Sequence, residues 1–241
     1  MSYLWISLIL GVVAGIANLL GCGIVGARPW SRSFLIYFIG LGAGFMLATA
    51  LAEMIPESFR LSPTATPLLV LLGYFIVHFF EHSWPAHFHF GEETHKEAFI
   101  KPRAAYTALG GLLVHTFFGG VAITSGFLVS TSLGILIFGA ILLHNVPEGF
   151  TMGSIMMAAR DDIRSGYWAV TALALSRIVG IVTMAATRHF VGFGLAISGG
   201  VTLYVAASDL IPEVNKEHGL RIAVMVAAGV AAVLLLQMAL G

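Results

Sequence analysis

The chain has 241 residues, of which 58% are hydrophobic and only 10% are charged, and its formal net charge at pH 7 is zero. Soluble domains carry about 25% charged residues, so this composition excludes an ordinary globular domain and indicates an integral membrane protein. The zero net charge gives no support for a nucleic-acid partner, and a single cysteine, Cys22, excludes an internal disulfide framework.

Hydropathy predicts eight membrane-spanning helices, which makes the chain an all-α polytopic membrane protein. Their ranges are roughly 3–22, 34–56, 67–83, 104–127, 131–157, 167–187, 190–210 and 220–240, and about 17–25 apolar residues are enough to cross a bilayer. The first run lacks the basic flank of a signal peptide, so we expect a retained span. Because the connections are short, residues 1–241 are expected to form a single transmembrane transporter domain.

Lysine and arginine in the loops predict the orientation of the chain. One side of the membrane collects nine of them, and the other side has only two, Arg60 and Arg188. Cytoplasmic loops carry the excess of positive charge, so both termini are expected outside the cytoplasm, in a plasma or inner membrane. The nine are Arg28, Arg32, Lys96, Lys101, Arg103, Arg160, Arg164, Lys216 and Arg221.

The longest loop, at about residues 84–103, is then cytoplasmic and contains several histidines. It follows His78, Glu81 and His82 at the end of the third span. Histidine-rich tracts often bind metal weakly, and these three residues are candidates for a cation pathway, although a solvated polar loop explains the tract equally well.

An internal repeat links the second and seventh spans. Residues 44–58 align without gaps with residues 200–214, and Glu53 matches Asp209. The predicted topology gives the two copies opposite orientations, as in transporters with inverted repeats, here spans 1–3 against 6–8 around spans 4 and 5. The alternative is chance similarity between two helices rich in alanine and leucine, which the shared acidic-x-x-Pro-Glu ending makes less attractive.

The repeat also places carboxylates near both membrane surfaces. Glu53 and Glu57 lie towards the outer surface, and Asp209 and Glu213 towards the inner one. They could attract a cation on entry and receive it on exit, or each Pro-Glu pair could simply end a helix. We favour a functional role for Glu53 and Asp209, which lie deeper, and leave both explanations open for the other two.

The fifth span contains the string His-Asn-Val-Pro-Glu-Gly at residues 144–149. His144 and Glu148 are four residues apart, so a helix presents them on one face. Pro147 lacks an N–H group and is expected to free a backbone carbonyl near Leu143. Ionisable groups at mid-membrane usually face a bundle interior and mark an ion path; a His–Glu pair that only locks helix packing is the alternative.

His115 lies near the middle of the fourth span, at a depth similar to that of His144. Together with Glu148, these histidines supply two nitrogen donors and one oxygen donor. Such a set suits Zn²⁺ and other borderline divalent ions, and poorly suits Mg²⁺ or Ca²⁺. The sequence therefore predicts a metal site here, with Zn²⁺, Fe²⁺, Mn²⁺ or Cd²⁺ as the ion.

Taken together, these features resemble the ZIP (zinc/iron-regulated transporter-like) family. Eight spans, a histidine-containing third loop and the string at 144–149 carry the resemblance, with supporting strings at 42–51, 79–82 and 208–213. It implies import of a divalent metal, first of all zinc, towards the cytoplasm without ATP or a prosthetic group. The family's metal positions fall on His115, His144, Glu148, Asn145 (which helps a second metal) and Met46 (a methionine ligand in some members).

The chain departs from the family at two carboxylate positions. Gly119 and Gly180 stand where many members place a carboxylate, and Arg177 has appeared nearby. A charged arginine is costly in hydrocarbon and stays protonated. Our hypothesis is that Arg177 points inward, takes the second metal's charge position and pairs with Glu148 or Asp209, leaving one metal per site. Alternatively, it faces another cavity or subunit.

Two other functions compete with transport. A relative that binds or senses metal without transporting it is motivated by the two glycines and Arg177. An intramembrane zinc hydrolase is less favoured, because no His-Glu-x-x-His string is present and no obvious base remains once Glu148 is a ligand. We therefore expect a protein that is not an enzyme, with lipid and metal as partners and with glycine-rich faces that permit a homodimer.

Overall fold

The computed structural model describes residues 2–27, 32–83, 102–160, 162–216 and 219–240, which are helical almost throughout and contain no strand. Seven helical stretches of this described part are long and apolar enough to cross a membrane. An eighth helix, α4 (Thr66–Ser83), has a shorter apolar part, Thr66–Phe80. The prediction of an all-α polytopic membrane protein is confirmed; the histidine-containing loop lies almost entirely outside the described residues.

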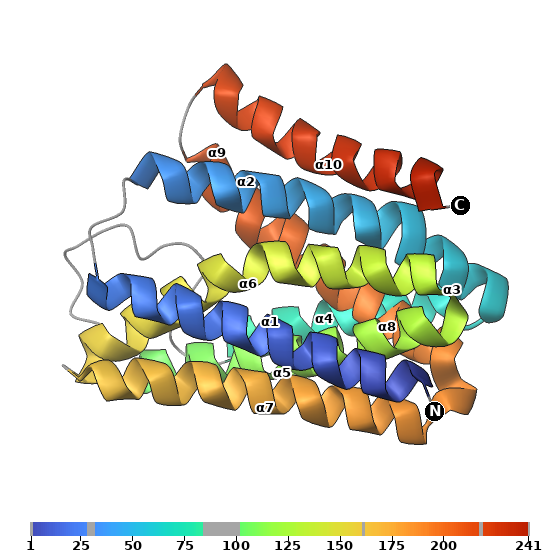
Figure 1. Ribbon diagram of the computed structural model, residues 1–241, viewed down its shortest axis with the longest axis horizontal. Coiled ribbons are helices and arrows are strands. Elements are labelled where there is room, and N and C mark those ends of the chain that lie inside the picture. Colours follow the sequence, from blue (N-terminus) through green and yellow to red (C-terminus); the bar gives the residue numbers. More distant parts are fainter. Residues whose placement is uncertain (1, 28–31, 84–101, 161, 217–218, 241) are drawn as a thin grey trace.

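The other helical elements follow the predicted spans closely. They are α1 (Ser2–Ala27), α2 (Arg32–Ala48), the π-helical η1 (Thr49–Met54), α3 (Ile55–Leu61), α5 (Pro102–Val129), α6 (Thr131–Arg160), α7 (Ile163–Ala186), the 3₁₀ turn η3 (Arg188–Phe190), α8 (Val191–Tyr204), the π-helical η4 (Val205–Leu210), α9 (Ile211–Asn215) and α10 (Leu220–Leu240). The start of α1 and the end of α10 lie at the same end of the bundle (Figure 1), as an even number of crossings requires.

The outer surface of the bundle is apolar. Large hydrophobic side chains such as Trp5, Leu68, Trp168 and Leu235 are exposed on α1, α4, α7 and α10. In water this surface would be unfavourable, whereas lipid tails solvate it. The buried polar groups, by contrast, lie between helices, which is the arrangement expected of a protein that spans a bilayer.

The helices form two groups that meet along α5 and α6. In one group α1 packs on α6 and α7, and α5 packs on α6 and α7; in the other, α2 packs on α10 and α4 packs on α8. The α2–α6 and α5–α8 contacts join the groups. Figure 1 shows α10 and α2 along one side of the bundle and α1 and α7 along the opposite side.

Close helix contacts support the inverted repeat. Figure 1 shows α2 and α8 running in opposite directions, and likewise α4 and α10. In the α2–α10 pair, a Cβ atom added at Gly44 or Gly229 would overlap the partner's backbone carbonyl; in the α8–α4 pair, Gly200 and Gly73 are placed in the same way. Gly200 lies 156 positions after Gly44, and Gly229 lies 156 positions after Gly73. The same shift aligns residues 44–58 with residues 200–214.

The two π-helical segments occupy the same register of the repeat. Thr49–Met54 and Val205–Leu210 each precede an Ile-Pro-Glu string and carry Glu53 and Asp209, respectively. Such wide turns occur frequently at functional sites. The helix continues to Leu61 as α3, which contradicts the idea that Pro56 and Glu57 end it, whereas α9 ends at Asn215, two residues beyond Glu213. Proline is tolerated in the first turn of such a stretch. Pro147 likewise lies inside an uninterrupted α6.

Candidate metal centre

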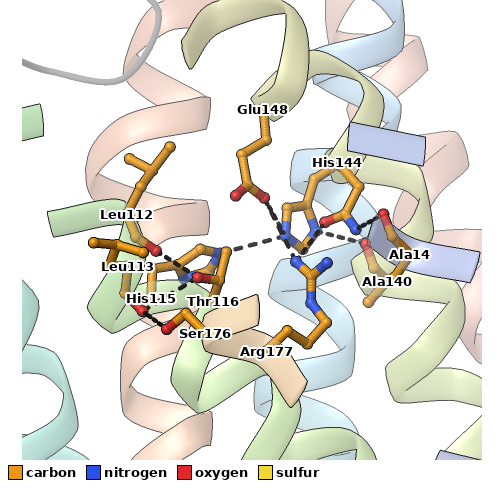
Figure 2. Close-up of polar contacts among 11 residues, drawn as sticks. Ala14, Leu112, Leu113, His115, Thr116, Ala140, His144, Glu148, Ser176 and Arg177 are labelled. Carbon is orange, nitrogen blue, oxygen red and sulfur yellow. Dashed lines mark hydrogen bonds and ion pairs between the residues drawn. The ribbon is translucent and has the colours of Figure 1, made fainter. Parts of the chain in front are cut away.

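Three buried side chains converge between α5 and α6. His115 of α5 and His144 and Glu148 of α6 each offer a ligand atom, and these atoms lie within 4.8 Å of one another. The exposed fractions are 7%, 5% and 0%, so the group is shielded from both lipid and water. Figure 2 shows the two imidazoles facing each other with the carboxylate beside them. In the part of the chain that the structure describes, this is the group of His, Cys, Asp and Glu suited to hold a metal ion.

The two imidazoles are arranged as a pair of zinc ligands would be. The Nδ1 atom of His144 lies 2.7 Å from the Ala140 carbonyl oxygen, which can only accept, so Nδ1 carries the proton and Nε2 keeps its lone pair. The Nε2 atoms of His144 and His115 are 3.3 Å apart. Two nitrogens bound tetrahedrally to one Zn²⁺ at about 2.0–2.1 Å are separated by about 3.4 Å, so the pair is preformed for this geometry.

Glu148 is close to both an imidazole and a guanidinium group. Its Oε2 atom lies 3.8 Å from His144 Nε2 and 3.9 Å from Arg177 Nη2. Neither carboxylate oxygen has a well-formed hydrogen bond to the described residues. A buried carboxylate is costly unless it is paired or coordinates a metal, so the carboxylate retains the capacity to bind a cation in addition to Arg177.

Arg177 points into the protein from α7 and is held by Asn145. Its Nη2 donates to Asn145 Oδ1 at 3.1 Å, while Asn145 Nδ2 donates to the Ala14 carbonyl oxygen at 2.8 Å. Both side chains are fully buried. The amide of Asn145 therefore ties α1, α6 and α7 together, and its oxygen is already engaged by the arginine.

Side-chain hydroxyls bind backbone carbonyl oxygens of α5 next to His115, and one of these bonds joins α5 to α7. Ser176 Oγ donates to the Leu113 carbonyl oxygen at 2.7 Å, and Thr116 Oγ1 donates to the carbonyl oxygens of Leu112 and Leu113. These contacts, drawn in Figure 2, lie on the turn that carries the histidine. They bind the backbone of this turn and leave the ring nitrogens of His115 unused.

Two helix crossings build the centre, and each uses a pair of glycines. In the first, α1 crosses α6 with Gly21 against Val146 and Gly149 against Asn18; in the second, α7 crosses α5 with Gly180 against Phe117 and Gly120 against Arg177. We call these the α1–α6 crossing and the α7–α5 crossing. At all four glycines, an added Cβ atom would overlap the opposing carbonyl oxygen, so larger residues are excluded.

The two crossings correspond residue by residue. Phe117 and Gly120 match Val146 and Gly149, 29 positions later, and the same shift brings His115 onto His144 and Gly119 onto Glu148. Position 119 is thus the counterpart of the Glu148 carboxylate. A Cβ atom at Gly119 would lie 3.9 Å from Arg177 Nε, so the guanidinium lies beside the position that lacks a carboxylate.

Asp209 lies near the histidines, whereas Glu53 lies in a separate, wider pocket. A cavity of about 10 Å³ is lined by His115, His144 and Asp209, with Val77, Gly111, Leu112, Val205 and Leu210. A pocket of about 530 Å³ opens between η1, α3, the α5–α6 turn and α10, and is lined by Glu53, Glu57 and Arg60. Glu57 Oε2 lies 3.0 Å from Arg60 Nη1.

Other predicted residues have different surroundings. Met46 is buried in an apolar cluster with Val77 and Leu136, and the His78 ring packs edge-on against Tyr204. The side chains of Glu81, His82 and Glu213 lie outside the described residues. A ligand role for Met46 and a pathway role for these residues stay predictions.

Sequence reasoning overlooked Asn18. This α1 residue is fully buried at the α1–α6 crossing, beside the residue that follows Glu148. The signal was available, since Asn18 is a primary amide inside an otherwise apolar span and polar residues inside membranes usually face functional interiors.

Comparison with known proteins identifies one family by two routes, a family model and similar proteins. Residues 91–237 match the family model described as ZIP zinc transporter. Zinc transporter ZIP9-A of Xenopus laevis is 26% identical over an alignment that covers 83% of each chain. Metal cation symporter ZIP14 of Mus musculus is 22% identical, with 85% of this chain and 59% of the relative covered, and zinc transporter ZIP13 of Mus musculus is 26% identical over 56% of this chain and 40% of its own length.

Proposed function

Because the chain belongs to the ZIP zinc transporter family, we propose that it carries a divalent cation, first of all Zn²⁺, into the cytoplasm through the centre formed by His115, His144 and Glu148. The observation that carries this proposal is the convergence of these three buried donors within 4.8 Å at the middle of the bundle. Zinc is the cargo here, and no prosthetic group is needed for its passage. Fe²⁺, Mn²⁺ and Cd²⁺ fit the same donors.

The donor set suits a carrier, which must release its ion. Structural zinc sites are closed by four protein ligands, whereas three protein ligands leave a position for water or an incoming ligand. Met46 or water would complete the coordination, and Asn145 would contribute only if its oxygen exchanged Arg177 for the ion. An open position lowers the barrier to exchange, which favours passage over storage.

We propose that one ion binds at a time. Arg177 lies beside Gly119, the counterpart of Glu148, and next to Glu148 itself. A fixed positive charge there opposes a second cation by Coulomb repulsion. The arginine then acts as a permanent substitute for the second metal, and it also balances the Glu148 charge in a membrane interior.

The route would connect the pocket that contains Glu53 with the small cavity between the two histidines and Asp209. The pocket lined by Glu53 would admit the ion at the end of the bundle where the termini lie, and the cavity lined by Asp209 would receive it beyond the histidines. About 10–15 Å³ is needed for a single water, so passage requires helix movement, as in alternating access. Termini outside the cytoplasm follow from the lysine and arginine distribution, and a homodimer stays a prediction.

The proposal is tested by ⁶⁵Zn²⁺ uptake into proteoliposomes. The wild type is expected to take up zinc, His144→Ala to take up none, and His189→Ala, which alters an exposed histidine of η3, to match the wild type. Competition by Fe²⁺, Mn²⁺ and Cd²⁺ ranks the cargo, and elemental analysis is expected to find one metal per chain. Equal uptake by the wild type and His144→Ala would contradict the route.

A relative that binds metal without transporting it is the second candidate. The observation that favours it is the Arg177–Glu148 contact at 3.9 Å, because the arginine competes with the cation for the one carboxylate of the centre. Zinc binding that depends on His144, together with no uptake of any of the four ions, would establish this function in place of transport.

A further inference from the structure

Asn18 is a buried amide whose polar atoms are unsatisfied. Its exposed fraction is 0%, and neither Oδ1 nor Nδ2 has a well-formed hydrogen bond within the described part of the chain. Leaving such a group unpaired costs about 1–3 kcal/mol in a protein interior, and no bulk water compensates for it in the bilayer core. An apolar residue at this position would pack at lower cost, so the amide calls for a function.

The α1–α6 crossing places this amide at the metal centre. The backbone of Asn18 lies against Gly149, the residue after Glu148. The side chain lies alongside the Glu148 carboxylate, whose two oxygens also lack well-formed hydrogen bonds to described residues. The Nδ2 donor of Asn18 and the carboxylate oxygens of Glu148, all without a well-formed hydrogen bond, therefore lie side by side.

The α7–α5 crossing supports this placement independently. There, Arg177 occupies the position equivalent to Asn18, lies against Gly120, and extends beside position 119, with Nε 3.9 Å from the place of its Cβ atom. The same backbone geometry directs the Asn18 side chain towards position 148. At each crossing, one polar side chain therefore extends from α1 or α7 to the residue before a glycine of the facing helix: Asn18 to position 148, and Arg177 to position 119.

We propose that Asn18 is a positioning residue of the metal centre: its Nδ2 group donates to one oxygen of Glu148 and turns the other towards the cation. The proposal rests on the proposed function in so far as Glu148 binds the ion. Ligating carboxylates are usually oriented by a hydrogen-bonded neighbour, and loss of such a neighbour typically weakens metal binding by about 10–100-fold. Because the amide is neutral, it orients the carboxylate without cancelling the negative charge that attracts the ion.

The test measures the Zn²⁺ dissociation constant and the Tm of the full-length protein in detergent. Asn18→Leu keeps the size of the side chain but removes the donor, and is expected to raise the dissociation constant by about 10–100-fold. Asn18→Asp keeps the shape and places a second carboxylate beside Glu148, so it is expected to lower the constant. Ser7→Ala is the matched control, since Ser7 is another fully buried and unsatisfied polar residue of α1, and it is expected to leave zinc binding unchanged.

Opposite shifts in the two Asn18 variants, with Tm close to that of Ser7→Ala, would support the positioning role. A dissociation constant for Asn18→Leu within about twofold of the wild type would overturn it, as would weakened binding in both variants in proportion to a lowered Tm. His144→Ala separates the two proposals. If the wild type binds zinc no better than His144→Ala, the proposed site itself fails; if binding shifts as expected but uptake is absent, only transport fails.

Discussion

The two crossings that build the metal centre share one backbone geometry but differ in chemistry. At the α1–α6 crossing, the neutral amide of Asn18 lies alongside the Glu148 carboxylate. At the α7–α5 crossing, Arg177 extends beside Gly119, so a cation meets a position without a side chain. Each crossing contributes one histidine, and these two imidazoles are 3.3 Å apart.

This difference separates the helix geometry, which is common to both crossings, from the charges, which individual side chains set. The glycine contacts fix how closely the helices approach and where positions 119 and 148 lie. The residues at 18 and 177 then decide the charge at those positions. On our proposal, a symmetric pair of carboxylates would hold two cations, whereas the guanidinium group beside the single carboxylate limits the centre to one ion.

Glu148→Gln would remove the carboxylate of the three-residue centre, and we expect it to have the largest effect on zinc binding and stability. Zinc binding should fall below detection, and Arg177, which is 0% exposed, would lose its counter-charge. Removal of one partner of a buried ion pair costs about 3–5 kcal/mol. The loss is measured by zinc titration and by the Tm of the purified protein.

The matched control is the double variant Glu148→Gln with Arg177→Gln. It leaves no unpaired charge, so the Tm should recover while zinc binding stays lost. If both variants were equally unstable, the 3.9 Å contact between Arg177 and Glu148 would not be an energetically important pair.

Gly119→Glu combined with Arg177→Gly would give each crossing a carboxylate and would remove the guanidinium group from the centre. The Cβ atom of the added side chain has room, because outside its own stretch of helix it would have only Ile141 Cδ1 at 3.8 Å and Arg177 Nε at 3.9 Å as near neighbours among the described residues, and Arg177→Gly removes the second. Two carboxylates without the arginine should bind two metal ions per chain, counted by elemental analysis after equilibrium dialysis. Gly119→Glu alone should stay at one ion, because Arg177 would pair with the new carboxylate.

Gly149→Ala and Gly120→Ala would disturb one crossing each. The new methyl groups would overlap the carbonyl oxygens of Asn18 and Arg177, which belong to helix backbones and cannot rotate away. Overpacking of this kind costs about 1–3 kcal/mol, so the Tm should fall to a similar extent in both variants. Gly110→Ala is the control, since no described atom outside its own stretch of helix lies within 4 Å of its added Cβ. Alanine is also the better helix former, so this variant should not lower the Tm.

Much of this architecture could be predicted from the amino-acid sequence. Apolar runs of about 20 residues reveal membrane helices because the bilayer imposes that length, and the His144–Glu148 spacing places both side chains on one face. The matching positions of Glu53 and Asp209 revealed the repeat. The first two predictions rest on local periodicity, and the repeat rests on the similarity of two segments 156 positions apart; a single sequence contains both signals.

The contact of Asn18 with α6 could not be derived in this way, whereas the family resemblance led us to expect Arg177 near Glu148 or Asp209. Nothing in the sequence around Asn18 shows that its helix crosses α6 at Gly149, because that contact joins residues 131 positions apart. The wide π-helical turns at Thr49–Met54 and Val205–Leu210 also escaped prediction, since hydropathy does not distinguish them from α-helix.

The smallest expected effects come from the acidic residues at equivalent positions of the repeat, and they distinguish its two ends. Glu53 is partly exposed in the wide pocket, whereas Asp209 is 3% exposed in the cavity shared with His115 and His144. Exposed charge pairs contribute about 0–1 kcal/mol and are screened by salt. Glu53→Gln should therefore slow zinc uptake by no more than about fivefold, and less at high salt.

Asp209→Asn should slow uptake by about tenfold or more at every salt concentration, since a buried charge near the ion needs to contribute only about 1.4 kcal/mol to do so. Initial rates of ⁶⁵Zn²⁺ uptake at low and high salt test both expectations, with the Tm measured to identify variants that are merely unstable. Equal and equally salt-sensitive effects would mean that the two copies of the repeat present equivalent mouths to the ion. A larger and salt-independent effect at Asp209 would instead place it next to the cargo, so that the repeat supplies an outer attraction at one end and a ligand-like contact at the other.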